Sequence, residues 1–94
     1  MTIRELIANL EARFERLANA EKAIKMSAYM KHQFIFFGIS APDRSAIQRD
    51  WFPLVKKHQP DFWTLILELW EKDEREFQMV AVDLSNMLDL STKI

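Results

Sequence analysis

The sequence predicts an all-α protein, and three observations support this prediction. Apolar residues recur at spacings of three and four near both ends of the chain, which is the periodicity of an amphipathic helix. No segment alternates convincingly between apolar and polar residues, so no β-strand is expected. Three prolines, a single glycine and several capping residues separate the apolar segments and mark where helices start and stop.

The length and composition fit one globular domain or a piece of one. The chain has 94 residues, of which 49% are apolar and 29% are charged. These proportions are typical of a folded chain and not of a disordered one. A compact chain of this size hides roughly 60–65% of the surface of its unfolded form. We therefore expect a single helical domain over residues 1–94.

The composition also argues against metals, cofactors and membrane insertion. The chain has no cysteine, and its two histidines, His32 and His58, lie far apart in the sequence. The chain therefore offers few of the ligands from which protein metal sites are built. No apolar run approaches the ~18 residues of a membrane span, and the N-terminus does not resemble a signal sequence. We expect a cytoplasmic chain that needs neither metal nor cofactor.

The first helix is expected from Ile3 to Leu17. Thr2 followed by Glu5 is the signature of a capping box. The residues of the helix that recur at helical spacing are apolar: Ile3, Leu6, Ile7, Leu10, Phe14 and Leu17. Asn19 is a suitable N-cap for a second helix, whose alanines would permit close packing.

The end of the second helix depends on how Phe34–Phe37 is interpreted. Four apolar residues in a row fit both a buried helical turn and a short extended segment. We expect a helix end. Gly38 is then the left-handed residue that terminates the helix, and Ile39 folds back toward Phe34 in a Schellman-type cap.

The third helix is expected to begin at Ser40 or Ala41. Pro42 falls in its first turn, where the missing N–H costs nothing. Pro53 removes a backbone hydrogen bond inside the helix and clashes with the preceding turn. We therefore expect a kink at this position, or a new short helix over residues 51–58.

The fourth helix follows the boundary formed by Gln59, Pro60 and Asp61. It carries few polar residues before Glu68, so we expect it to be sandwiched between neighbouring helices. The same pattern places Trp63 and Trp70 in the core.

The last helix begins with Asp73 and Glu76, which repeat the pattern of a capping box, and it reaches about Asp89. Its apolar stripe consists of Phe77, Val80, Ala81, Leu84, Met87 and Leu88.

Short helices joined by short turns suit either a compact bundle or the stacked antiparallel pairs of a solenoid. The face from Phe77 to Leu88 has no further helix to cover it before residues 91–94. We therefore expect the chain to self-associate through this face. No strong internal repeat is visible in the sequence.

The distribution of charge leaves room for a local basic patch. The net charge is −1, so the chain as a whole has little attraction for a polyanion. Acids dominate residues 68–76, where we interpret them as solvated helix caps. The basic residues of the middle of the chain are Lys22, Lys25, Lys31, Arg44, Arg49, Lys56 and Lys57.

The motifs contain no catalytic constellation. No serine or threonine has the His and Asp partners that nucleophilic catalysis needs, and one glycine cannot form a phosphate-binding loop.

Tyr29 lies within one helical turn of Lys25 and close to Lys31. A tyrosine beside cations can stack on a base while the cations hold phosphates, although composition alone favours a half-buried structural tyrosine. For Trp51, we favour a place in the core.

Several blocks of the sequence, in their order and spacing, carry a family resemblance: Asn19–Ala23, Met26–Lys31, Phe34–Ile39, Pro42–Arg44, Glu68–Trp70 and Glu74–Gln78. Together they resemble the N-terminal portion of the AlkD-like DNA alkylation repair proteins. The resemblance runs from about Asn19 to Leu84.

The resemblance implies both a fold and a function. The fold is an α-solenoid of HEAT-like helical repeats, of which this chain would hold about five to six helices in antiparallel pairs. Its concave basic surface would bind double-stranded DNA. The family consists of glycosylases that remove bases with cationic alkyl lesions, such as 3-methyladenine and 7-methylguanine, without a metal. Tyr29 would match a tyrosine of the lesion-facing cleft, and Lys31 and Arg44 would lie near the DNA.

One departure from the family concerns catalysis. The family's catalytic aspartate, and the tryptophans and arginine that accompany it, come from later repeats and have no counterpart here. Asp83 and Asp89 precede that segment and are not assigned its role. Removal of a cationic base requires a carboxylate that stabilises the developing positive charge on the sugar. We therefore expect the chain, a fragment or a natural short relative, not to be catalytic alone.

The expected role is a scaffold that carries part of a DNA-binding surface. The alternative is a small helical module for protein interaction or oligomerisation, without DNA activity. A complete enzyme with unrelated chemistry is the least favoured interpretation.

Overall fold

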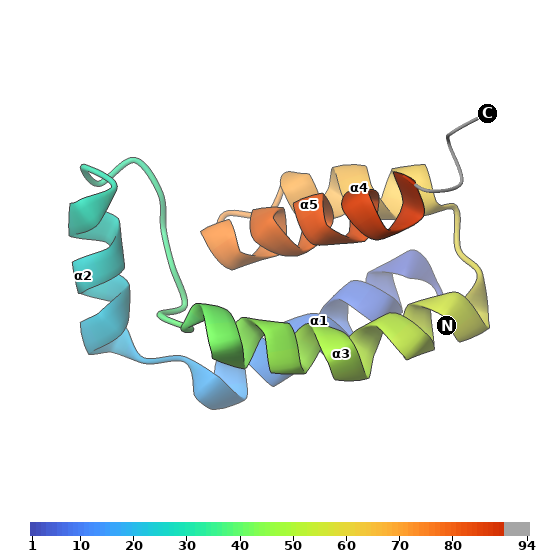
Figure 1. Cartoon of the computed structure of the whole chain (residues 1–94), viewed down its shortest axis with the longest axis horizontal. Coiled ribbons are helices and arrows are strands. Elements are labelled where there is room, and N and C mark those ends of the chain that lie inside the picture. The colour runs from blue at the N-terminus through green and yellow to red at the C-terminus, as the bar shows by residue number, and fades with distance from the viewer. Residues whose placement is uncertain (90–94) are drawn as a thin grey trace.

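The computed structural model describes residues 1–89, which contain five helices and no strand (Figure 1). The helices are α1 (Ile3–Leu17), α2 (Ala20–Tyr29), α3 (Ala41–His58), α4 (Phe62–Trp70) and α5 (Arg75–Asp89). A single isolated bridge joins Ile35 to Glu74. The all-α prediction is confirmed. No helix of the described part is long and apolar enough to cross a membrane.

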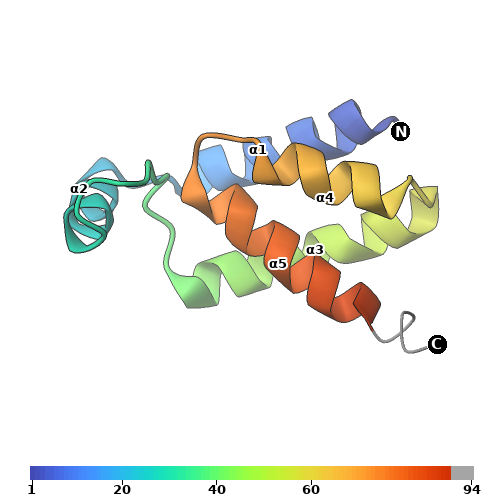
Figure 2. The ribbon, with the colours of Figure 1, turned by 90° about the horizontal axis from the view of Figure 1, so that it is seen from above.

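Four of the helices form two antiparallel pairs that stack on each other. α1 lies beside α3, and α4 lies beside α5, as Figures 1 and 2 show. The pairs meet where α1 contacts α4 and where α3 contacts α5. The stack therefore has one edge formed by α1 and α4 and another formed by α3 and α5. Stacked helix pairs of this kind build helical-repeat solenoids.

The core lies between the two pairs and includes one fully buried tryptophan. Trp51 has no exposed surface, and its indole N–H donates to the backbone carbonyl of Leu6 at 2.9 Å. This bond links α3 to α1 and confirms the core position expected for Trp51. The rings of Phe14, Phe37 and Phe77 pack with centroids 5.4 to 5.6 Å apart.

The predicted helix starts are confirmed where they depend on local capping. Thr2 accepts a hydrogen bond from the N–H of Glu5 at 3.1 Å, and Glu5 accepts one from the N–H of Thr2 at 2.8 Å. These bonds form the capping box and lower the pKa of the Glu5 carboxyl. Asn19 caps α2 and Ser40 caps α3 through their side chains.

The C-terminal end of α2 comes earlier than predicted. Lys31 adopts a left-handed backbone with φ of 58°, and its N–H donates to the carbonyl of Ala28 at 3.0 Å. The N–H of His32 donates to the carbonyl of Ser27 at 2.7 Å. This pair of bonds is the Schellman motif. The predicted type of cap is present, but it was placed too late in the chain, at Gly38.

The prediction that Phe34–Phe37 ends a helix is wrong, because residues 34–39 belong to no helix. They lead from α2 to α3 in the sequence, and in space they lie between α2 and the start of α5. We call residues 34–39 the connecting segment. Gly38 has a φ of 88°, and a Cβ atom at this position would lie 2.0 Å from the carbonyl oxygen of Asn19. The glycine is needed because the segment approaches the backbone of α2 so closely.

α3 continues through Pro53 as one helix of 18 residues. The alternative of a new short helix over residues 51–58 is therefore wrong. Pro53 lies on the exposed side of α3, whereas Trp51 and Val55 on either side of it are fully buried. Burial of these neighbours holds both halves of the helix against the core despite the lost hydrogen bond.

The prediction that α4 is sandwiched is also wrong. Leu65 and Leu69 are fully buried, but Trp63, Leu67 and Trp70 are 65%, 60% and 47% exposed. The two outer tryptophans are therefore not core residues. α4 packs against α5 and α1, and no described element covers its outer face.

Two predictions for α5 need correction. Glu76 does not complete a capping box with Asp73, because its buried carboxylate binds the connecting segment instead. The stripe expected for self-association, from Phe77 to Leu88, contributes to the core: Phe77, Val80, Ala81 and Leu84 are buried. These four residues are covered because α5 packs on α3 and α4. The side chain of Leu88 and residues 90–94 lie outside the described part of the chain.

Candidate nucleic-acid interface

α2 stands apart from the rest of the fold. No residue of α2 has its Cα atom within 8 Å of a Cα atom in another of the described helices, and none of its side chains is buried. Figure 1 shows α2 at one end of the stack, set across the direction of the other helices. We call α2 the arm. Its last turn carries Tyr29, and the cap that follows carries Lys31.

Tyr29 is 87% exposed, so the expectation of a half-buried structural tyrosine is wrong. It is exposed because the arm has no neighbouring helix to cover its last turn. Tyr29 lines a shallow apolar cleft of about 330 Å³. The other residues of this cleft, which we call the Tyr29 cleft, are Lys25, Met26, Met30, Phe36 and Met79.

Two lysines flank Tyr29. Lys31 is exposed in the left-handed cap. Lys25 is also exposed and lies 3.7 Å from Glu21 in an ion pair on the surface of the arm. Such exposed pairs contribute little because water and salt screen them. Both cations can therefore approach a phosphate.

Arg44 is held more tightly than the lysines. Its side chain is only 17% exposed, and its guanidinium donates to Gln48 at 3.1 Å and lies 3.5 Å from Asp83. It also donates to the sulfur of Met79 at 2.8 Å. Gln48 in turn donates to Asp83 at 2.9 Å. This network fixes the guanidinium at the edge formed by α3 and α5.

The structure brings Tyr29 and Arg44 into neighbouring clefts. Arg44 lines a cleft of about 200 Å³ together with Arg75, Gln78, Met79, Val82 and Asp83. Met79 also lines the Tyr29 cleft, so the two clefts adjoin at this residue. Lys31 lines neither of them. The three residues predicted from the sequence therefore lie on the arm and on the adjoining edge, with Lys31 at the periphery.

The sequence reasoning missed Arg75. Its guanidinium carbon lies 4.3 Å from the ring centroid of Phe34 and 5.8 Å from that of Trp70. One signal could have singled it out. Arg75 is the first residue of α5, where the positive end of the helix dipole disfavours a cation. A cation in that position needs compensating contacts, and here two aromatic rings supply them.

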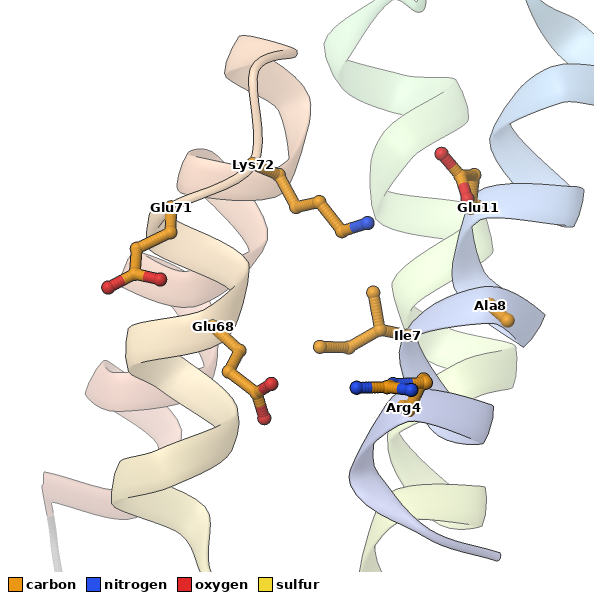
Figure 3. Close-up of a pocket in the computed structure, with 7 residues that line it drawn as sticks. All are labelled: Arg4, Ile7, Ala8, Glu11, Glu68, Glu71 and Lys72. Atoms are coloured by element: carbon orange, nitrogen blue, oxygen red, sulfur yellow. The ribbon is translucent and has the colours of Figure 1, made fainter.

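The opposite edge, between α1 and α4, has a different character. A cleft of about 410 Å³ there is lined by Arg4, Ile7, Ala8, Glu11, Glu68, Glu71 and Lys72. Figure 3 shows the Glu68 carboxylate and the Arg4 side chain reaching into the space between the helices, whereas Glu71 points away. Because the acidic residues that line this cleft outnumber its two cations, the cleft disfavours the binding of a polyanion such as DNA. Among residues 1–87, whose side chains the structure describes, no three His, Asp or Glu side chains are grouped so that they could hold a metal ion.

The fold and the site define a class of protein: an all-α chain of stacked helix pairs, with an exposed tyrosine and basic side chains around one edge. A family model described as DNA alkylation repair enzyme matches residues 10–93. The chain belongs to the DNA alkylation repair enzyme family. The resemblance seen in the sequence is thereby confirmed.

A solved structure supports the same assignment. It is described as a predicted DNA alkylation repair enzyme from Enterococcus faecalis, and it is 44% identical to this chain with a TM-score of 0.68. The similarity covers 79% of this chain and 35% of that chain, so this chain spans about a third of the length of its relative. A comparison with curated proteins finds no match.

Proposed function

We propose that this chain is the N-terminal helical-repeat part of a DNA alkylation repair protein and contributes scaffold and part of the surface that binds double-stranded DNA. The observation that carries the proposal is the exposure of Tyr29 on the arm, beside an apolar cleft and between lysines. An exposed aromatic ring can stack on a base, and neighbouring cations can hold the phosphates. The DNA would lie along the arm and the edge formed by α3 and α5, in the cytoplasm.

Each site residue has a distinct role in this proposal. Tyr29 faces the base, and the methionines beside it provide a polarisable surface that adapts to the shape of a ligand. Lys31 contacts a phosphate from its exposed cap. Arg44 contacts a second phosphate, and its bonds to Gln48 and Asp83 fix its direction before the DNA arrives.

The same geometry supports a role without catalysis by this chain alone. Asp83 is the one carboxylate that lines the Tyr29 cleft or the Arg44 cleft among the described residues. It already accepts hydrogen bonds from Gln48 and Arg44. The Arg44 guanidinium, 3.5 Å away, already balances the charge of Asp83, which weakens its attraction for the positive charge that develops on the sugar when a base leaves.

The first prediction tests DNA binding. Affinity is measured on plain duplex and on duplex with an abasic-site mimic, at low and at moderate salt. Tyr29→Ala should weaken binding by about fivefold or more, because base stacking contributes ~1–3 kcal/mol. Lys31→Ala and Arg44→Ala should weaken binding to both duplexes alike and reduce the salt dependence by about one phosphate contact each.

Two matched variants serve as controls. Trp63→Ala removes an exposed aromatic ring from the outer face of α4, and Lys57→Ala removes an exposed cation from the far end of α3. Both should bind DNA as the unchanged chain does. Absence of binding at low salt, or equal losses in the control variants and the site variants, would contradict the proposal.

A second candidate function is supported by the outer face of α4. Trp63, Leu67 and Trp70 recur at helical spacing on this face and are exposed. An apolar groove of about 360 Å³ lies between α4 and α5, next to Leu67 and Val82. Exposed apolar patches of this kind mark interaction surfaces. The alternative is therefore a helical module for protein interaction or oligomerisation that acts through α4, and not through the buried stripe of α5.

A further inference from the structure

Glu76 is a fully buried carboxylate that contacts the backbone of the connecting segment. Its Oε1 accepts a hydrogen bond from the N–H of Phe37 at 2.9 Å. Its Oε2 accepts hydrogen bonds from the N–H groups of Gly38 and Ile39 at 3.1 and 3.2 Å. One side chain of α5 therefore binds three consecutive residues of the segment.

The surroundings of Glu76 suit a carboxylate rather than a neutral group. Burial of an ionised carboxyl is costly unless hydrogen bonds replace the lost water. Three N–H donors do so here, and hydrogen bonds to a charged acceptor are stronger than neutral ones. Glu76 also lies in the first turn of α5, where the helix dipole favours a negative charge.

The other side of the connecting segment holds the arm. The N–H of Asn19 donates to the carbonyl of Phe37 at 2.9 Å, and the hydroxyl of Ser27 donates to the carbonyl of Phe34 at 3.0 Å. Gly38 lies against the backbone of Asn19. Since no other helix within residues 1–89 approaches the backbone of the arm, we take the connecting segment to determine where the arm lies.

We infer that Glu76 is a positioning residue that fixes the direction of the arm, and with it the location of Tyr29 relative to the edge formed by α3 and α5. This inference rests on the proposed function, in which Tyr29 faces DNA. The Phe37 ring packs between Phe14 and Phe77 independently of the carboxylate. Loss of the carboxylate therefore loosens the backbone of the segment while the ring still anchors it.

The experiment uses Glu76→Gln, which keeps the size of the side chain but replaces one accepting oxygen by an amide that donates. Tyr29 is the single tyrosine of the chain, so 3-fluorotyrosine gives one ¹⁹F resonance that reports on the end of the arm. We expect this resonance to shift or broaden in the variant. If the arm of the variant holds Tyr29 in its DNA-binding position only a tenth of the time, the affinity for DNA falls about tenfold.

The direction of the change in affinity separates positioning from simple electrostatics. Removal of a negative charge by itself strengthens binding to DNA. Glu15→Gln, which neutralises an exposed carboxylate on α1, should bind slightly more tightly and leave the ¹⁹F resonance unchanged. The inference therefore predicts a lower DNA affinity for Glu76→Gln, whereas the matched control Glu15→Gln should have a slightly higher one.

A second variant, Ser27→Ala, covers the case in which Glu76→Gln does not fold. It removes the hydrogen bond from the arm to Phe34, and no side chain of the arm is buried in the core. It should disturb the ¹⁹F resonance and leave the unfolding temperature unchanged. An undisturbed resonance and unchanged affinity in folded Glu76→Gln would overturn the inference. Absence of DNA binding by the unchanged chain would overturn the proposed function, while the ¹⁹F result would still decide the role of Glu76.

Discussion

At Lys31, the conformation of the backbone favours glycine, whereas the proposed phosphate contact requires a cationic side chain. Its backbone lies in the left-handed region with φ of 58°, where an L-residue costs roughly 1–2 kcal/mol relative to a right-handed conformation. Glycine is the usual residue at this position of a Schellman motif. The structure thus has a lysine where helix capping favours a glycine, and the proposed phosphate contact provides a reason for the cation.

The second prediction follows from this conflict. Lys31→Gly should stabilise the cap by about 1 kcal/mol. Amide exchange in the arm should then slow by about fivefold. The same variant should bind DNA more weakly, because it loses a cation. Lys57→Gly provides the matched control: it places glycine inside a right-handed helix and should destabilise α3 by about 1 kcal/mol. Faster exchange in the arm of Lys31→Gly would show that the cap does not strain the lysine.

At the scale of the helix, α4 differs from its neighbours because it is apolar on two faces. One face packs Leu65 and Leu69 into the core, while Trp63, Leu67 and Trp70 remain exposed on the other. The apolar groove shared with α5 continues this exposed face. Removal of such a surface from water favours association.

The third prediction is that the chain self-associates through α4. Sedimentation over a wide range of concentrations should show an increase in average mass, and Leu67→Glu should abolish it because the variant places a charge in the contact. Ala8→Glu adds the same charge at an exposed position on α1 and should leave association unchanged. A strictly monomeric profile for the unchanged chain would exclude this role for α4.

The starts of α1, α2 and α3 were predictable from the sequence, whereas the capping of α5 and the end of the arm were not. The caps at Thr2, Asn19 and Ser40 depend on residues a few positions away, so local patterns reveal them. The connecting segment depends on Arg75, whose N–H donates to the carbonyl of Ile35 at 2.7 Å, and on Glu76. No local pattern reveals partners so distant in the chain.

Exposure was harder to predict than helicity for a related reason. An apolar run indicates that a residue can be buried, but not that a neighbour exists to cover it. This is why Trp63 and Trp70 were assigned to the core and Tyr29 was expected to be half-buried. The DNA-binding assignment of Tyr29, Lys31 and Arg44 came from the family resemblance. Arg75 was missed because Phe34, the nearer of its two aromatic partners, lies far from it in the sequence.

At the scale of the whole molecule, the two edges of the helix stack differ in chemistry. The edge of α3 and α5 carries Arg44 and Arg75 and adjoins the lysines of the arm. The cleft at the edge of α1 and α4 is lined by three acidic residues and two cations, Arg4 and Lys72. With a net charge of −1, only this uneven distribution can direct DNA to one side.

The fourth prediction is that the chain alone releases no alkylated base. Methylated duplex DNA incubated with the chain should lose 3-methyladenine and 7-methylguanine no faster than DNA without protein, measured by chromatography of the released bases. The reason is that Asp83 is already bound to Gln48 and Arg44. Release that disappears in Asp83→Asn would identify Asp83 as a catalytic residue and would refute the proposed division of roles.

The way α1 is buried has a consequence for the synthesis of the chain. Among the described helices, α1 lies beside α3 and α4, and its Phe14 ring also packs on Phe37 and on Phe77 of α5. All of these partners are made after α1, and the hydrogen bond from Trp51 to Leu6 spans 45 positions. While α1 is being made, none of them is available to cover Leu6, Leu10 and Phe14. α4 and α5, by contrast, are neighbours in sequence and can pair as soon as both are outside the exit tunnel. α1 is thus made before each of the helices that enclose it.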